Sequence, residues 1–352
     1  MEKITILLSS FERGGITRTF TELFNELSRS TEVSFICFEN RTPLLEKDIK
    51  VNVLGVGKVK NIFYKLPIAI KRYFALKTYL SLNQSSVLIC ADPSTTLLGW
   101  IYSLTHTSMR IIGGCHVPKN LMTLQDKLIL KYLYPHLKYI VVPSETLNRE
   151  LADLSSKIKA EVIPNMVPID SCKNPWPKIG AIRENHLYFG RFSPEKNPKH
   201  LLNMANHDPS ATYLFCGEGE EFPDLIRYCR EESIHNVKFD VYQAASDVMP
   251  KANLLIIPSR NESFGISALE AWIQGVPVLA STEATGVLEL MNMLSIVDAH
   301  RSLRDGIHLW VSRAQQMSLE PLEANISRSV LENFHPSVVI TQWKELLAPR
   351  NV

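Results

Sequence analysis

Short apolar runs alternate with longer segments of helical periodicity along the chain, and this alternation limits the folds that the chain can adopt. In the first half, we expect strands at Ile4–Ser9, Glu32–Phe38, Val51–Val53, Ser86–Cys90, Arg110–Cys115 and Lys138–Val142. Most of these runs are almost wholly apolar, which is typical of parallel strands covered on both faces. Helices are expected between them, for example at Thr17–Leu27, Leu66–Leu82 and Leu124–Tyr132. The pattern predicts a doubly wound α/β fold.

The alternation stops near residue 171 and then begins again. Ser171–Lys178 is polar and contains two prolines, as linkers between domains often do. After it, strands are expected at Leu187–Phe189, Ala211–Cys216, Val237–Phe239, Leu254–Ile257 and Pro277–Ala280, and helices at Lys199–Asn206, Glu221–Glu231 and Ile266–Gln274. The 352 residues also exceed the ~250–300 that one core usually supports. We therefore predict an α/β protein of two tandem Rossmann-like domains that face a central cleft.

Composition argues against several classes of protein. The net charge of +2 gives no reason to expect nucleic acid as a partner. No two of the six cysteines form a Cys-x-x-Cys pair, and Cys37, Cys90 and Cys216 lie inside apolar runs expected to be buried strands. We therefore expect reduced thiols and a cytoplasmic protein. The N-terminal apolar run is too short for a signal peptide, and no apolar run reaches the ~18 residues of a membrane span.

A dinucleotide-dependent oxidoreductase is one two-domain alternative. Its fingerprint, Gly-x-Gly-x-x-Gly, follows a strand and opens a helix. Gly217-Glu218-Gly219 follows an expected strand, but Phe222 stands where the third glycine is needed. The three glutamates of this segment would also place negative charge beside the pyrophosphate. The segment therefore argues against dinucleotide binding.

The segment 259–270 has the pattern of a phosphate site. An expected strand ends at Ile257, a polar turn follows, and a helix is expected to begin near Gly265. Ligands of open α/β sheets bind where strands end, and a helix N-terminus attracts phosphate through its free N–H groups and its dipole. Gly265 would let a phosphate approach the backbone closely. Glu262 stays in the loop, and Glu270 lies about one and a half turns into the helix, where a carboxylate could accept hydrogen bonds from ribose hydroxyls. Either glutamate alone also suits a solvated surface.

A second polar segment, 190–197, follows the expected strand Leu187–Phe189. It carries Arg191 and Lys196 just after Gly190. An arginine makes bidentate contacts with phosphate and a lysine acts as a point charge, so the two suit a diphosphate clamp. Taken alone, the segment equally suits a solvated surface turn.

Together these segments resemble a known family. The sequence is similar to retaining glycosyltransferases of the GT-B fold, a large family with a Glu-x7-Glu motif that includes bacterial polysaccharide and glycolipid hexosyltransferases. The similarity runs from Tyr188 to Trp343, and the Glu-x7-Glu spacing falls at Glu262 and Glu270. The helix–turn–strand segment that follows, Ala271–Ala280, also matches. The order and spacing of the motifs carry the resemblance more than any one motif.

The resemblance implies a role for each candidate residue. Arg191 and Lys196 would bind the donor diphosphate. Glu262 would contact the transferred sugar, and Glu270 would bind the ribose. Arg191, Lys196 and Glu262 are therefore catalytic candidates, together with His116 at a strand end, although a lone histidine also suits a structural role. The other donor-binding candidates are Gly190, Gly217, Phe264, Gly265, Ile266 and the N-terminal glycine loop of Gly14 and Gly15.

The resemblance also implies domain roles and a reaction. Residues 1–172 would bind the acceptor and residues 180–335 the nucleotide sugar, with the C-terminal helix 336–352 packing back on the first domain. A hexose or N-acetylhexosamine would pass from a nucleotide-diphosphate sugar, with UDP favoured, to a glycan or lipid-linked acceptor of a bacterial lipopolysaccharide or capsule. The resemblance implies retention of configuration by front-face attack. No Asp-x-Asp occurs in the sequence, so we expect no metal and no cofactor.

Two alternatives within this fold stay open. A sugar-nucleotide 2-epimerase would act on the donor without an acceptor, and a non-catalytic protein would bind the nucleotide sugar without turning it over. The intact set of Arg191, Lys196, Glu262 and Glu270 favours catalysis. The late glycine pair of the family is Thr285-Gly286 here, which leaves the selectivity for base and sugar open.

Charge is distributed unevenly along the chain. Residues 1–170 hold 21 Lys and Arg against 15 Asp and Glu, whereas residues 171–352 hold 17 against 21. Between Asp48 and Asp92 there is no acid, while seven bases alternate with aromatic and aliphatic residues. At helical spacing, Lys65 and Arg72 would flank an apolar face within residues 58–80, which suits an anionic membrane surface. We predict a peripheral protein on the inner face of the cytoplasmic membrane, the alternative being a core-packed helix with a solvated basic side.

Overall fold

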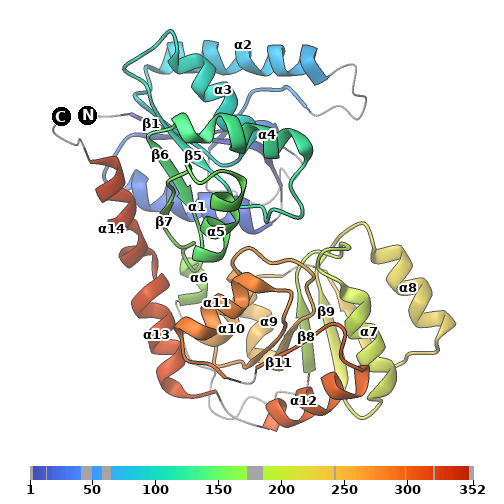
Figure 1. Ribbon diagram of the computed structural model, residues 1–352. Helices are drawn as coiled ribbons and strands as arrows, with labels where there is room; N and C mark the ends of the chain where they lie inside the picture. The colour runs from blue at the N-terminus through green and yellow to red at the C-terminus, as the bar shows by residue number, and fades with distance from the viewer. Residues whose placement is uncertain are drawn as a thin grey trace. The chain divides into compact units, whose positions relative to one another are not determined.

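The computed structural model describes residues 3–12, 14–40, 50–57, 65–172, 185–241, 243–297, 299–319 and 322–348. The chain divides into two compact units (Figure 1). Unit 1 comprises Met1–Pro164 and Ile340–Val352, and unit 2 comprises Asn165–Val339. The start of the expected linker lies in a short helix of unit 2, α6 (Ile169–Cys172), and Lys173–Lys178 lie outside the described residues.

Within the described residues, unit 1 is built on a seven-stranded parallel sheet with the order β3-β2-β1-β4-β5-β6-β7. The strands are β1 (Ile4–Phe11), β2 (Val33–Asn40), β3 (Val51–Val53), β4 (Val87–Cys90), β5 (Arg110–Gly114), β6 (Tyr139–Val142) and β7 (Glu161–Val162). All six strands predicted for this half are confirmed. The edge strand β7 is too short to show a periodicity and was not predicted.

The helices of unit 1 between these strands are α1 (Gly15–Ser28), α2 (Lys65–Asn83), α3 (Pro93–Ser103), α4 (Leu124–Tyr132) and α5 (Glu145–Leu154). Asp92, Thr123 and Ser144 cap α3, α4 and α5, because each side chain accepts a hydrogen bond from the backbone N–H of the third helical residue. Since crossovers between parallel strands are right-handed, the strand order places α2, α3 and α4 on one face of the sheet and α1 on the other.

Within the described residues of unit 2, six parallel strands follow the order β10-β9-β8-β11-β12-β13. They are β8 (Asn185–Phe189), β9 (Thr212–Cys216), β10 (Val237–Asp240), β11 (Ala252–Ile257), β12 (Val278–Ser281) and β13 (His300–Arg301). The five predicted strands are confirmed, and β13 at the edge is a further short strand. The two sheets together confirm the predicted class of two tandem Rossmann-like domains.

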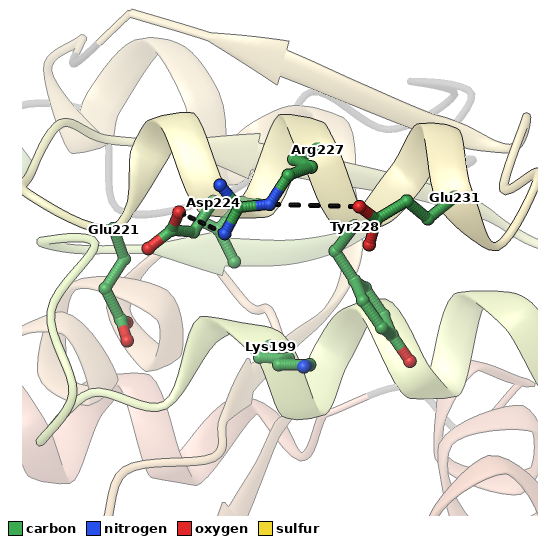
Figure 2. A pocket seen from close by; sticks show the side chains of 7 residues that line it. Lys199, Glu221, Asp224, Arg227, Tyr228 and Glu231 are labelled. Carbon is green, nitrogen blue, oxygen red and sulfur yellow. Dashed lines mark hydrogen bonds and ion pairs between the residues drawn. The ribbon is translucent and has the colours of Figure 1, made fainter.

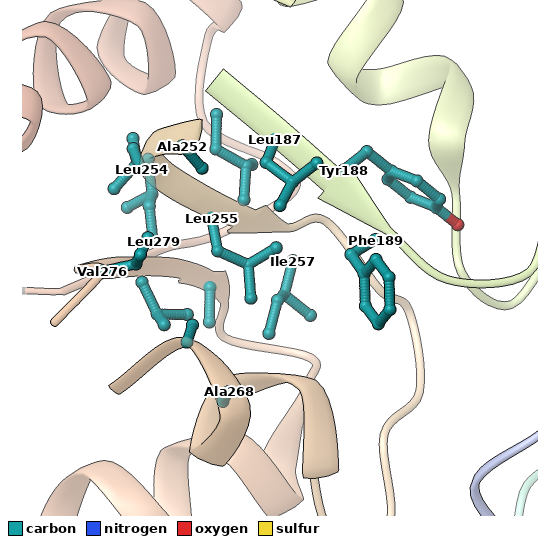
Figure 3. Packing of buried hydrophobic residues seen from close by; sticks show 14 of the residues in the cluster. Leu187, Tyr188, Phe189, Ala252, Leu254, Leu255, Ile257, Ala268, Val276 and Leu279 are labelled. Carbon is teal, nitrogen blue, oxygen red and sulfur yellow. The ribbon is translucent and has the colours of Figure 1, made fainter. Parts of the chain in front are cut away.

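The helices of unit 2 after α6 are α7 (Pro198–His207), α8 (Phe222–Glu231), α9 (Ala245–Val248), α10 (Ile266–Ile273), α11 (Thr285–Met293), α12 (Ile307–Leu319) and α13 (Ala324–Phe334). Figure 3 shows Leu255 and Ile257 of β11 packed between Leu187 of β8 and the helix α10, which contributes Ala268 to the same core. Trp272 of α10 is also fully buried. This packing fixes α10, which carries the candidate residue Glu270, against the sheet.

The C-terminal helix α14 (Pro336–Leu347) begins in unit 2, and its residues from Ile340 onward belong to unit 1. Arg110, at the start of β5, donates hydrogen bonds to the backbone carbonyls of Leu347 and Ala348. These bonds tie the end of α14 to the first sheet, as predicted for the C-terminal helix. In the part of the chain that the structure describes, no helix combines the length and the apolar character needed to cross a bilayer.

Candidate functional site

The strand order of each sheet reverses at one point, and ligands of open α/β sheets bind at such points. In unit 2 the point lies between β8 and β11, because β9 and β10 extend to one side and β12 and β13 to the other. In unit 1 it lies between β1 and β4. Each predicted site residue follows a strand at one of these points or beside it: Gly190–Lys196 after β8, Glu262–Glu270 after β11, Gly217 after β9, Gly14-Gly15 after β1 and His116 after β5.

The turn after β8 is held from two sides. A Cβ on Gly217 would lie 1.9 Å from the carbonyl oxygen of Gly190, so this residue must be glycine for the two loops to touch. Tyr188 donates its hydroxyl to the backbone carbonyl of Arg191. Burial raises the pKa of Tyr188 well above its ordinary value, so the hydroxyl keeps its proton. Because the loop of Gly190 leaves no room for a Cβ, Gly217 has a packing role whether or not it also contacts a ligand.

Both cations of the candidate site are paired with carboxylates. Arg191 Nη2 lies 3.2 Å from Glu195 Oε1, and Lys196 Nζ pairs with Glu262 Oε2. The Arg191 side chain is 52% exposed, whereas those of Lys196 and Glu262 are 23% and 15% exposed, so the second pair is better shielded from water. Burial alone would raise the pKa of Glu195, but hydrogen bonds and the two cations hold it below its ordinary value. An anionic ligand thus has to displace or bridge two ion pairs.

Two further contacts join the loops after β8 and β11. The backbone N–H of Arg260 donates to the carbonyl of Glu195 at 2.8 Å, and Asn197 Nδ2 donates to the carbonyl of Pro258 at 3.1 Å. Asn197 has a φ of 51°, in the left-handed region that asparagine enters more readily than most residues. Together with the Lys196–Glu262 pair, these contacts hold the two loops to each other.

The helix α10 begins directly after the loop that follows β11. Its N-cap is Gly265, which has a φ of 102° and no side chain with which to cap the first turn. A Cβ at Gly265 would lie 2.6 Å from Val287 Cγ2, so packing also requires glycine here. Phe264 and Ile266, on either side of this N-cap, are buried, at 3% and 8% exposure. A helix N-terminus of this kind suits an anion.

Glu270 is the fifth residue of α10 and is fully buried. The hydroxyl of Ser171, in α6, donates to Glu270 Oε1 at 3.1 Å. One turn further along α10, Gln274 Nε2 donates to the carbonyl of Ser171 at 3.1 Å. The carboxylate that we predicted to bind a ribose therefore already accepts a hydrogen bond from a hydroxyl, and α6 covers it.

The candidates of unit 1 gather around α1. Gly14 is the N-cap of this helix, and a Cβ there would meet no atom within 4 Å, so packing does not explain the glycine. Gly15 begins the helix. His116 is buried and packs edge-on against Phe20 of α1, with 5.2 Å between ring centroids. Burial lowers the pKa of His116 to about 4, despite an opposing effect of Asp92, so the ring is neutral at physiological pH.

Four residues that shape the site were not predicted. They are Glu195, Asn197, Ser171 and Gln274. Asn197 stands directly before Pro198 at a helix start, which is a signal that sequence reasoning can use. Ser171 lies 99 residues from Glu270 in the sequence, and no local pattern points to that contact.

A pocket of about 290 Å³ lies between α7 and α8 (Figure 2). In its wall, Arg227 Nη2 lies 2.6 Å from Asp224 Oδ1, and Arg227 Nε lies 3.9 Å from Glu231 Oε1. The ammonium of Lys199 lies 4.2 Å from the ring centroid of Tyr228. None of the predicted site residues lines this pocket, and we assign it no ligand.

Two family models match the chain, one in each half. Residues 13–171 match the model described as Glycosyltransferase Family 4, and residues 181–316 match the model described as Glycosyl transferases group 1. The two matches contain all of the candidate residues of both units. The chain is a GT-B glycosyltransferase.

This glycosyltransferase has relatives in bacterial glycan synthesis. It is 22% identical, over 99% of both chains, to the GalNAc-alpha-(1->4)-GalNAc-alpha-(1->3)-diNAcBac-PP-undecaprenol alpha-1,4-N-acetyl-D-galactosaminyltransferase of Campylobacter jejuni. It is 29% identical to an uncharacterized 41.2 kDa protein in the cps region of Klebsiella pneumoniae over 44% of its own length, a match that spans only 48% of that relative. Among solved structures, HepE of Anabaena in complex with UDP and glucose superposes with a TM-score of 0.76 at 16% identity over 99% of both chains, which shows a shared fold.

Proposed function

We propose that this glycosyltransferase transfers a hexose or N-acetylhexosamine from a UDP-sugar to a glycan or lipid-linked acceptor, with retention of configuration, in bacterial surface polysaccharide synthesis. The observation that carries the proposal is the placement of Arg191 and Lys196 on the loop after β8, which the Lys196–Glu262 pair joins to the loop that leads from β11 into α10. A diphosphate needs positive charge and N–H donors of this kind. In this proposal unit 2 binds the donor and unit 1 the acceptor.

The donor diphosphate takes the cations from their present partners. Arg191 leaves Glu195 and Lys196 leaves Glu262, because a diphosphate offers more negative charge than one carboxylate. As the bond from the sugar to the phosphate breaks, charge grows on the phosphate oxygen, and these cations and the first N–H groups of α10 stabilise it. The acceptor hydroxyl attacks the anomeric carbon on the face that the phosphate leaves, and its proton passes to the leaving diphosphate.

The two glutamates take different parts in this proposal. Glu262, once Lys196 has left it, accepts a hydrogen bond from a hydroxyl of the transferred sugar. Glu270 accepts hydrogen bonds from the ribose, whose hydroxyl replaces that of Ser171. The neutral ring of His116 offers one donor and one acceptor nitrogen to the uncharged sugar or acceptor.

The choice of UDP and of a surface glycan rests on the relatives. The Campylobacter protein is named for transfer of N-acetylgalactosamine to an undecaprenol-linked glycan, and HepE was solved with UDP and glucose. We extend both properties to this chain because it shares the GT-B fold and because Arg191 and Lys196 suit a diphosphate.

We also propose that the reaction needs no metal ion and no other cofactor. Two observations support this. Arg191, Lys196 and the N-terminus of α10 could neutralise the negative charge of the diphosphate, and no Asp-x-Asp occurs in the sequence. Activity is therefore expected to persist in excess EDTA. Loss of activity on chelation that magnesium or manganese restores would contradict this part of the proposal.

A donor screen tests the proposed function. The protein is incubated with UDP-glucose, UDP-galactose and their N-acetyl forms, with and without a polyprenyl-diphosphate-linked oligosaccharide, and the release of UDP is measured. UDP release that needs the acceptor, and a product with the anomeric configuration of the donor by NMR, would support retaining transfer. An isomerised sugar nucleotide made from donor alone would identify a 2-epimerase instead. Tight UDP binding without turnover of any donor would identify a non-catalytic binding protein.

A further inference from the structure

The outer side of α2 is apolar, although its inner side already packs into unit 1. Leu76 and Leu80 are buried in the core under the helix. On the outside, Leu66, Ile70 and Phe74 follow one another at intervals of four residues and are 71%, 48% and 58% exposed. A helix that covers a sheet normally turns polar side chains to water, so this second apolar side needs an explanation.

The helix α4 repeats the pattern. Leu124, Leu128 and Tyr132 have the same spacing and are 74%, 48% and 63% exposed. At the end of α3, Leu104 is 58% exposed. The helix α3 packs against both α2 and α4, so the three helices that carry these exposed side chains are neighbours in unit 1 (Figure 1). We call the outer side of α2, α3 and α4 the docking face.

The docking face is basic as well as apolar. The helix α2 lies within residues 49–91, which contain no Asp or Glu. Lys71 and Lys77 are exposed on α2, and so is Lys131 on α4. The ammonium of Lys131 lies 5.5 Å from the ring centroid of Tyr132. The one acid of α4, Asp126, is engaged in the N-terminal capping box with Thr123.

The structure also corrects the predicted composition of this face. Arg72 was expected to flank it, but its guanidinium lies 4.9 Å from the ring centroid of Phe38 and donates to the carbonyl of Val56. Arg72 therefore points inward, over the sheet. Lys58–Tyr64 and the side chain of Lys65 lie outside the described residues, so the inference rests on α2, α3 and α4 alone.

We propose that the docking face binds the surface of an anionic phospholipid bilayer and holds the protein there as a peripheral membrane protein. The leucine and aromatic side chains enter the boundary between headgroups and acyl chains, and the lysines stay at the phosphates. Charge complementarity selects this occupant, because a symmetric dimer through the same face would bring like-charged lysines together. The inference goes beyond the reaction and holds whichever sugar is transferred.

Flotation with vesicles tests the proposal without donor or acceptor, so the result is independent of the reaction. The wild-type protein is expected to float with vesicles of phosphatidylcholine and phosphatidylglycerol at low salt and to be released at high salt, since salt screens the attraction. Protein that stays with the soluble fraction at low salt would overturn the proposal, as would equal binding to vesicles of phosphatidylcholine alone.

Matched variants locate the contact. Phe74→Ser is expected to weaken vesicle binding at least about tenfold, because the phenyl ring that would enter the bilayer is lost. Lys71→Ala and Lys77→Ala are each expected to weaken it about fivefold. Leu319→Ser, Lys238→Ala and Lys251→Ala alter exposed residues of unit 2 and are expected to bind like wild type. Circular dichroism and UDP binding check that each variant is folded.

Two further outcomes decide against the docking face. If the unit 2 variants weaken binding as much as Phe74→Ser does, the contact lies elsewhere. If light scattering shows a dimer that Phe74→Ser dissociates, and the wild type does not float, the face covers a second copy of the chain instead.

Discussion

The two switch points of this glycosyltransferase carry different charge, although both lie in parallel sheets and both lead into a helix with glycine as its N-cap. In unit 2, Arg191 and Lys196 are paired with carboxylates on the loops after β8 and β11. In unit 1, burial keeps His116 uncharged beside the switch point. The two N-cap glycines also differ in their packing. A Cβ at Gly265 would clash with Val287, whereas a Cβ at Gly14 would meet no atom within 4 Å.

Even the acid at the switch point of unit 1 is engaged. Asp92 follows β4, but its carboxylate caps α3 and accepts a hydrogen bond from Ser94 at 2.6 Å. The hydroxyls of Ser9 and Ser94 lie 3.2 Å apart beside it. This difference fits the proposed reaction, in which unit 2 binds the charged nucleotide diphosphate and unit 1 binds the uncharged hydroxyl groups of the acceptor.

Removing a cation from unit 2 should have the largest effect. Lys196→Ala is expected to lower kcat by roughly 100- to 1,000-fold, because one preorganised partner of the developing phosphate charge is lost. The control is Lys199→Ala, an exposed lysine three residues away whose ammonium contacts Tyr228 instead. Steady-state kinetics with saturating donor measure the effect. A kcat near that of wild type, in a protein that still melts cooperatively, would remove Lys196 from the mechanism.

The uncharged state of His116 can be tested through stability. The pKa of His116 falls from 6.5 to about 4 on folding. Between these pH values the histidine is protonated in the unfolded chain but not in the folded chain. His116 therefore costs stability progressively as the pH falls from about 6.5 to about 4, by up to about 3 kcal/mol. His116→Gln is expected to unfold with a shallower pH dependence in urea than wild type. His235→Gln, at an exposed position, is the control, and equal slopes for wild type and His116→Gln would contradict the prediction.

The buried carboxylate of unit 2 should matter for nucleotide affinity. Glu270→Gln keeps the size of the side chain but removes the charge that strengthens hydrogen bonds from ribose hydroxyls. UDP affinity is expected to fall about 10- to 100-fold by calorimetry, as for loss of hydrogen bonds to a charged group. The control is Glu231→Gln on the exposed side of α8. Unchanged UDP affinity would mean that Glu270 serves packing alone.

The central strands and the motif loops could be predicted because their signals are local. The strands β4 and β11 end at Cys90 and Ile257 as predicted, and the helix Leu124–Tyr132 agrees with the structure at both ends. The edge strands β7 and β13 have two residues each and leave no pattern to find. Arg191, Lys196 and Glu262 were identified from loops that follow strands.

The partners of these residues could not be predicted, because they depend on how distant segments pack. Lys196 and Glu262 are 66 residues apart and meet only because β8 and β11 are neighbours. On α2, helical periodicity places Arg72 but not the end of its long side chain, which turned inward towards Phe38. Sequence periodicity gives the position of a residue on its helix, but the position of the charged group at the end of a long side chain depends on tertiary packing.

The smallest effect, and the one with the opposite sign, should come from α6. Ser171 donates a hydrogen bond to the carboxylate that we assign to the ribose, so it competes with the nucleotide. Ser171→Ala removes the competitor and is expected to raise UDP affinity by about two- to tenfold, the worth of one hydrogen bond.

The double variant Ser171→Ala with Glu270→Gln separates competition from a general loosening of α6. If the ribose takes the place of the serine hydroxyl, the gain from Ser171→Ala should shrink when Glu270 is already glutamine, because the two changes act on one hydrogen bond. If α6 merely packs over the site, the gain should be the same in both backgrounds. A loss of UDP affinity in Ser171→Ala would instead show that α6 supports the bound nucleotide, and the charged switch point of unit 2 would then be complete only with α6 in place.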